Sequence, residues 1–136
     1  KKSFRNIDTS SKMKKNIIIC AVIVFFALSM NVALSEMQYP QEMMDVSAPY
    51  PGATITQTIM VPNNLMVGLE SGDDLEKILE FYKTNLVANG WTISAETRQQ
   101  GHSGLIGEKG SNNAVVQINT GQTGRTMIML MLAPKQ

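Results

Sequence analysis

The chain has 136 residues, a formal net charge of +1 and 17% charged residues. The charge is unevenly distributed, because residues 1–35 hold six of the twelve basic side chains and only one acidic side chain. Residues 36–136 hold six basic and ten acidic side chains, a net charge of −4, with the bases scattered along the chain. This balance excludes the basic surface that nucleic-acid binding requires.

Residues 13–35 have the pattern of a signal peptide. Residues 13–16 give a basic start, the run from Ile17 to Leu28 is apolar, and residues 33–35 put small side chains at the cleavage positions. This pattern predicts export to the periplasm or secretion from the bacterial envelope. Glu36 is then the first residue of the mature chain.

An uncleaved membrane anchor is the alternative for this segment, because residues 17–34 form an apolar stretch of 18 residues and a spanning helix needs about 20. Cys20 lies inside the stretch and follows Ile19, whereas a lipid-attachment cysteine needs a small residue before it. The predicted mature chain is therefore free of cysteine, which excludes disulfides, thiol catalysis and cysteine metal sites from it. Residues 1–12 form an upstream segment to which the sequence assigns no role.

The mature chain is expected to begin with an extended arm over residues 36–49, which contain proline and methionine without a period. One domain is expected to follow over residues 50–136. Residues 53–61 alternate in the way of a half-buried strand. A turn at residues 62–64 and a second alternating segment at residues 65–69 predict a hairpin.

Residues 71–91 predict one amphipathic helix. Its apolar side chains recur at steps of three and four and share one face: Leu75, Ile78, Leu79, Tyr82 and Leu86. Ser71, Asp73 and Asp74 are the candidates for the N-cap. Residues 89–91, Asn-Gly-Trp, supply the left-handed glycine and the hydrophobic contact that end many helices.

Four further strands are expected after the helix, with polar and glycine-rich turns between them: residues 91–96, 103–109, 114–119 and 125–133. Strands joined by short turns pair antiparallel, and one amphipathic helix can cover one face of such a sheet. The predicted fold is α+β, a single antiparallel sheet of about six strands in the order β-β-α-β-β-β-β with one helix packed on one face. About 100 mature residues leave room for one core and one domain.

The sequence resembles a broad family of small bacterial exported domains, many of them lipoproteins. The resemblance rests on Tyr50-Pro-Gly-Ala53, Asp73-Asp74, Phe81-Tyr-Lys83 with Leu86, and Gly90-Trp91. It extends from Tyr50 to about Leu132 and involves a strand-entry turn, a helix face and a helix stop. The resemblance implies an exported domain of this fold and no assigned chemistry. Leu75 departs from it, since proline is common there, and the lipid-attachment cysteine is missing.

No combination of residues in the sequence predicts catalysis, a cofactor or a metal site. Residues 101–104, Gly-His-Ser-Gly, place a histidine beside a serine, but Leu105 stands where the hydrolase turn needs glycine. His102 is the single histidine of the chain, so few residues are available to form a general-base pair or a zinc site. We expect a non-catalytic domain, with a hydrolase-like enzyme that uses His102 as an alternative.

Methionine is the unusual residue of the mature chain. From Thr126 to Leu132 methionine alternates with isoleucine and leucine, so this strand is apolar on both sides. The alternation of the first hairpin suggests that its two methionines also point away from the helix. The predicted contact surface comprises Met60, Met66, Met127, Met129 and Met131.

One helix covers only one face of a sheet, so the methionine face needs another cover. The candidates are the arm at residues 36–49, a second copy of the chain in a homodimer, an apolar ligand, or a partner protein that the flexible thioethers fit. We expect an exported binding or interaction domain. The alternatives are a carrier with an apolar cavity between helix and sheet, the hydrolase-like enzyme, and a copper(I)-binding protein, because thioethers are soft ligands.

We predict that export removes the leader after Ser35, the best small-residue site after the apolar run. Intact-mass analysis of the protein from a bacterial envelope fraction should then find Glu36 at the N-terminus. A mature chain that retains residues 17–34 would instead establish a membrane anchor.

Overall fold

The strands and the long helix of the computed structural model follow the predicted order. The structure describes residues 37–136, so the expected signal peptide at residues 13–35, the segment 1–12 and Cys20 lie outside the described part. The elements are α2 (Gln41–Met44), β1 (Thr54–Val61), β2 (Asn64–Ser71), α3 (Leu75–Ala88), β3 (Thr92–Gln99), β4 (His102–Lys109), β5 (Asn112–Thr120) and β6 (Thr126–Pro134). Within residues 37–136, neither helix is long and apolar enough to cross a membrane.

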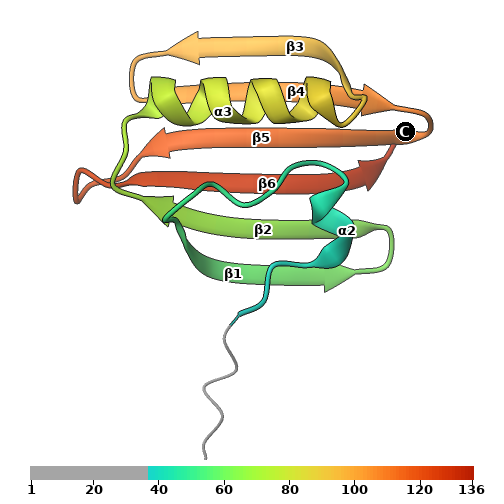
Figure 1. Ribbon diagram of the computed structural model, residues 1–136, viewed down its shortest axis with the longest axis horizontal. Coiled ribbons are helices and arrows are strands. Elements are labelled where there is room, and N and C mark those ends of the chain that lie inside the picture. Colours follow the sequence, from blue (N-terminus) through green and yellow to red (C-terminus); the bar gives the residue numbers. More distant parts are fainter. Residues whose placement is uncertain (1–36) are drawn as a thin grey trace, which may run out of the picture. The chain divides into compact units, whose positions relative to one another are not determined.

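The six strands form one antiparallel sheet in the order β1-β2-β6-β5-β4-β3 (Figure 1). Short turns join β1 to β2 and connect the meander from β3 to β6, and the two parts meet where β2 pairs with β6. The predicted α+β fold with a single antiparallel sheet is confirmed. The structure adds the strand order, which the sequence left open.

α3 lies over β3, β4 and β5, and its ends have the predicted chemistry (Figure 1). Asp74 is the N-cap and accepts a hydrogen bond from the backbone N–H of Lys77 at 2.8 Å. At the other end Gly90 has a φ of 85°, and the backbone N–H of Trp91 donates to the carbonyl of Leu86 at 2.9 Å, which closes a Schellman turn. The inward stripe of the helix has no exposed surface and comprises Ile78, Leu79, Tyr82 and Leu86.

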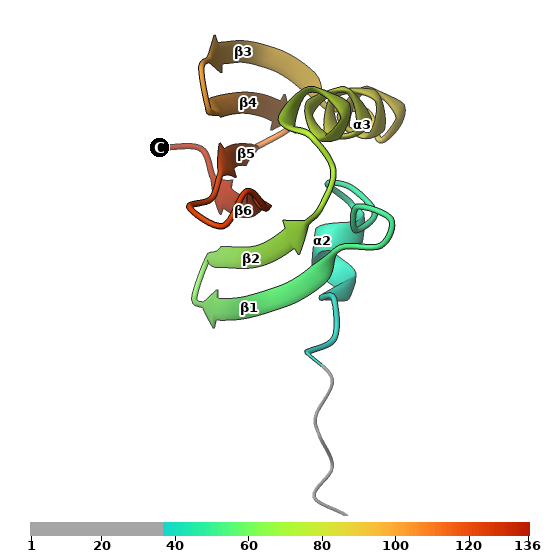
Figure 2. The ribbon, with the colours of Figure 1, turned by 90° about the vertical axis from the view of Figure 1, so that its left-hand side faces the viewer.

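The segment from residue 37 to residue 53, which includes α2, lies on the same side of the sheet as α3 (Figure 2). The indole N–H of Trp91 donates to the carbonyl of Asp45 at 2.8 Å, and the side-chain amide of Asn89 donates to the carbonyl of Val46 at 3.1 Å. The side chain of Val46 is fully buried. The segment expected to be an extended arm thus contains a short helix and belongs to the core, and it does not cover the opposite face of the sheet.

A β-bulge in β1 reverses the side-chain alternation of that strand. Ile55 pairs with Leu69, and the register then shifts by one residue at Thr56. Ile55 packs against the core on the helix side, whereas Ile59, beyond the bulge, is 42% exposed on the other side. An uninterrupted alternation would have put both isoleucines on the same side.

Ion pairs connect the edge strand β3 to the outer side of α3. Arg98 contacts Glu76, Glu80 at 2.7 Å and Glu96 at 2.6 Å, and the ammonium of Lys83 lies 2.8 Å from Glu96. The Lys83 ammonium and the Arg98 guanidinium hold the pKa of Glu96 below its usual range. Each exposed pair contributes little alone, but together they fix the position of the edge.

Tyr50 joins the N-terminal segment to the start of α3. Its hydroxyl donates a hydrogen bond to the carboxylate of Asp73 at 2.6 Å, and its ring packs edge-on against Phe81 with centroids 5.0 Å apart. Burial, with the hydrogen bond to Asp73, raises the pKa of Tyr50 to about 12. The bonds from Tyr50 and Lys77 hold the pKa of Asp73 below its usual range.

We predict that Leu79→Ala lowers the free energy of unfolding by about 2–5 kcal/mol, because the side chain is fully buried in the inward stripe of α3. Val87→Ala is the matched control on the same helix, since Val87 is 59% exposed, and it should change stability by less than about 0.5 kcal/mol. Urea unfolding followed by circular dichroism measures both. Equal losses would mean that the inward face of α3 is wrongly assigned.

We also predict a loss of stability in acid. The pKa of Asp73 is lower in the folded state than its ordinary value of 3.8, so the contribution of its carboxylate to stability is present above that pH and disappears as the pH falls through the folded pKa. Tyr50→Phe removes the hydrogen bond that is the largest cause of the lowered pKa, so it should reduce stability near pH 7 more than near pH 3. The difference between the two losses should match the stability that Asp73 contributes to the native protein at pH 7 and loses in acid. Urea midpoints at the two pH values test this, and an equal loss at both would contradict it.

Candidate functional site

The face of the sheet opposite α2 and α3 (Figure 2) is here called the open face. The strand register and the burial of Ile128 and Leu130 place the methionines of β6 on it. Ile128 and Leu130 point toward the helices and are 1% and 0% exposed. Met127, Met129 and Met131 alternate with them and point the other way, Met127 being 41% exposed and the other two half-buried. The strand therefore has the two apolar sides that its sequence predicts.

An apolar row crosses the open face from one edge of the sheet to the other. Residues opposite each other on neighbouring antiparallel strands have their Cβ atoms about 4.5–5.5 Å apart, so their side chains touch. The successive register partners of this row, from β1 to β3, are Ile59, Met66, Met131, Val115, Ile106 and Ala95. Ile59 and Ile106 are 42% and 39% exposed, so a partner can reach the row.

The row of side chains on the Met129 side of the apolar row is uncharged, whereas the row on the other side includes Glu108, which is paired with Lys135. The uncharged row comprises Gln57, Gly68, Met129, Gln117, Gly104 and Thr97. Two carboxylates toward the ends of the open face are already paired, Glu70 with Arg125 at 2.5 Å and Glu108 with Lys135 at 2.7 Å. A partner of the open face therefore meets a neutral centre with ion pairs at its margin.

A shallow hollow of about 130 Å³ adjoins the row where Gly104 lacks a side chain. Ile106 and Val115 border it on the side of the apolar row, and Thr97 and Gln117 lie beyond. The open face thus has a small recess at Gly104, a form that fits a protruding apolar side chain.

Met60 does not lie on the open face, contrary to the sequence-based expectation. It pairs with Leu65, whose side chain is buried on the helix side of the sheet. The physical reason is the bulge at Thr56, which shifts the alternation of β1 by one residue. Ile59 takes the place on the open face that the unbroken pattern gives to Met60. The structure brings the other four predicted methionines together, with Met66 directly beside Met131.

Val115 and Ile106 also belong to the apolar row and were not predicted from the sequence. Val115 had a usable signal, because it lies in the predicted strand at residues 114–119, and an alternating strand directs neighbouring residues to opposite faces. Its neighbour Val116 is fully buried. Ile106 lies in the glycine-containing strand β4, where alternation is weaker because Gly104 and Gly107 carry no side chains.

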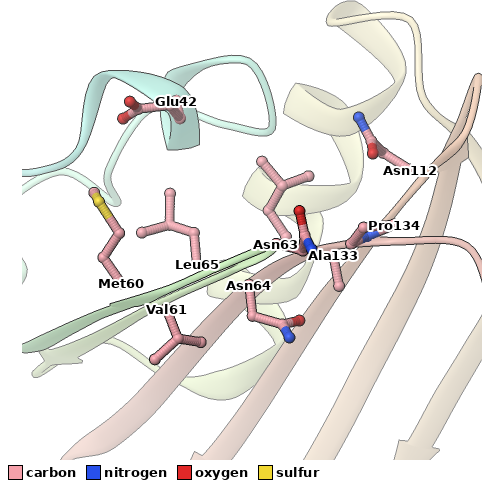
Figure 3. Close-up of a pocket in the computed structure, with 10 residues that line it drawn as sticks. Glu42, Met60, Val61, Asn63, Asn64, Leu65, Asn112, Ala133 and Pro134 are labelled. Atoms are coloured by element: carbon pink, nitrogen blue, oxygen red, sulfur yellow. The ribbon is translucent and has the colours of Figure 1, made fainter.

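Met60 instead borders a groove of about 290 Å³ between α2 and the ends of β1, β2 and β6 (Figure 3). Figure 3 shows Met60 and Leu65 pointing toward α2, which carries Glu42, while Asn112 borders the groove from β5. The groove combines an apolar wall with one carboxylate and several amides. Its volume is at the lower end of those that hold small molecules, about 300–1,000 Å³.

His102 lies on the open face near the start of β4. Its ring Nδ1 is 2.5 Å from the side-chain oxygen of Asn119 on β5, and its register partner on β3 is Gln99. Both neighbours are amides, whereas the usual orienting partner of a catalytic histidine is a carboxylate. In the part of the chain that the structure describes, no group of three or more His, Cys, Asp or Glu side chains is placed to hold a metal ion.

A family model described as START domain-like matches residues 53–125, more than half of the chain. The chain therefore belongs to the START domain-like family. The match runs from the last residue of the Tyr50–Ala53 turn, through α3 and its stop, to the turn before β6. No curated protein and no solved structure matches the chain. Membership of this family is compatible with a small domain that binds a ligand or another protein.

We predict that mild peroxide oxidises Met127 much faster than Met43, because the thioether of an exposed side chain is accessible and Met43 is fully buried. Met66, Met129 and Met131 should react at intermediate rates. Mass mapping of peptides at several times measures the order. Protection of all the open-face methionines to the level of Met43 in a dilute sample would mean that another segment covers this face.

Proposed function

We propose that the protein is an exported, non-catalytic binding domain that uses the open face of its sheet to hold an apolar partner. The observation that carries the proposal is the apolar row, which runs through all six strands on the face that the described helices leave free. Membership of the START domain-like family supports a binding role in general terms.

The composition of the row supports recognition of an apolar surface. Met66 and Met131 are unbranched and polarisable side chains that adapt to the shape of a partner, while Ile59, Val115 and Ile106 are stiffer. Contiguous exposed apolar surface of this kind marks interaction sites in soluble domains. Burial of a fully exposed large side chain contributes about 1.5–3 kcal/mol. The side chains of the row are already partly buried, so each contributes less than this before the cost of association.

The partner that fits best is a protein with a neutral apolar surface. A protein fits better than a small molecule, because small ligands need a concave site of about 300–1,000 Å³ that encloses most of their surface. The recess on the open face holds only about 130 Å³. The carboxylates near the margin are already paired, so a partner gains little from basic groups. The recess over Gly104 offers one place for an anchoring side chain.

A carrier of a small apolar ligand is the second candidate, and the groove of Figure 3 favours it. The ligand would lie beside Met60 and Leu65 at the end of the sheet. The cavity first expected between α3 and the sheet has no such support, since the inward stripe of α3 packs on the strands with no exposed surface. The hydrolase-like and copper(I) alternatives stay predictions without a supporting observation.

The test uses Nile red, an uncharged fluorescent probe of apolar surface. Met131→Lys puts a charge at the centre of the row and should lower probe affinity by about tenfold or more, which corresponds to about 1.4 kcal/mol. Val87→Lys on the outer side of α3 is the matched control and should bind as the native protein does, since Val87 is 59% exposed. Circular dichroism verifies that each variant is folded.

Two outcomes would contradict the proposal. Unchanged probe binding by Met131→Lys would remove the open face as a binding site. Loss of binding in Met60→Lys with retention in Met131→Lys would instead assign the site to the groove of Figure 3 and favour the carrier.

A further inference from the structure

The two edges of the sheet differ in a way that concerns association. The described chain leaves β1 and β3 with one unpaired side each. Edge strands are commonly protected by charges and bulges, which prevent pairing with another chain. β3 has both kinds of protection: a bulge between Ile93 and Ala95, and the charged side chains of Glu96 and Arg98, which are held against α3 by ion pairs.

β1 has no charged residue in its eight positions, Thr54–Val61. Its bulge lies near the start, at Thr56, and leaves the last part of the strand in regular register with β2. There Ile59, Met60 and Val61 are 42%, 65% and 49% exposed, so both sides of this part of the strand are apolar and accessible. Alternate residues of an antiparallel edge strand also direct backbone N–H and C=O groups outward.

We propose that β1 pairs with β1 of a second copy of this chain, antiparallel and about a twofold axis perpendicular to the sheet. An uncharged edge strand with apolar side chains on both sides pairs most readily with another strand of the same kind. β1 has these properties, so the β1 strand of a second copy is a suitable partner. With an axis perpendicular to the sheet, the open faces of the two copies lie on one side of the joined sheet and the helices of both copies on the other. With Met60 opposite Met60 on the helix side, Ile59 of each copy faces Val61 of the other on the open side. With the register shifted so that Met60 faces Thr58, Ile59 faces Ile59.

The pairing joins the two sheets into one, and it makes the apolar rows of the two copies continuous, because Ile59 is the end of the row at this edge. Two modest surfaces become one long surface. The pairing itself uses the edge and not the open face, so it stands independently of the function proposed for that face.

The first test is the solution mass of the full chain, as recovered after expression, by sedimentation over a range of concentrations. The native protein should approach twice the monomer mass. Met60→Lys should raise the dissociation constant of the dimer by about tenfold or more, since two ammonium groups are brought together beside the axis. The isolated copy tolerates this change because Met60 is 65% exposed.

Two control variants separate this proposal from the previous one. Val87→Lys introduces the same charge at a 59% exposed position on α3 and should leave the dimer intact. Ile106→Lys alters the apolar row four strands away from β1 in the sheet, so it should weaken probe binding and leave the dimer intact. A native protein that stays monomeric, or a dimer that survives Met60→Lys unchanged, overturns the pairing.

Disulfide trapping locates the contact. In a Cys20→Ser background, Met60→Cys and Ile59→Cys place thiols next to the proposed axis on the two sides of the sheet, and at least one should form an intermolecular disulfide on mild oxidation. Thr97→Cys is the control on the opposite edge and should not. Rapid trapping through Thr97→Cys alone would assign the contact to β3 and contradict the proposal.

Discussion

Trp91 contacts the end of α3, the N-terminal segment and strand β4, and the arrangement of the rest of the structure depends on these contacts. The backbone N–H of Trp91 closes the turn that ends α3, and its indole N–H binds the carbonyl of Asp45 at 2.8 Å. A side chain at Gly107 would lie 3.4 Å from the Trp91 Cβ, so glycine at that position lets the indole rest directly on β4. Lys109 covers the ring from outside and donates to the carbonyl of Asn89 at 2.8 Å. One side chain thus sets the positions of helix, N-terminal segment and sheet.

Because α3 and the N-terminal segment are both held at Trp91, they share one face of the sheet. That face contains the core, including the fully buried Tyr82, and the strands supply its apolar side chains in alternation. The opposite face receives no helix from residues 37–136, yet the strands still alternate apolar residues onto it. A contiguous apolar surface on this face is the physical reason for the proposal that a partner covers it.

The sequence predicted the features that nearby residues determine. The period of α3, its stop at residues 89–91 and the common face of Met127, Met129 and Met131 all depend on spacings of a few positions. The strand order and the bulge in β1 depend on contacts between distant segments, and the bulge is what moved Met60 to the other side. The helix Gln41–Met44 is too short for its own propensity to reveal it, and its place is set by contacts of the neighbouring residues with the turn after α3.

The two-part construction of the sheet determines the order in which it can assemble. The β1–β2 hairpin and the meander from β3 to β6 each form from local contacts, whereas Leu65 of β2 must find Leu132 of β6 across most of the domain. Closing so long a loop is slow compared with forming a hairpin. Until it closes, β6 is the free edge of the meander, and residues 126–132 are uncharged, rich in isoleucine, leucine and methionine, and free of proline. The topology therefore predicts that a chain whose meander forms before β2 docks would aggregate through β6, and that pairing with β2 removes this risk.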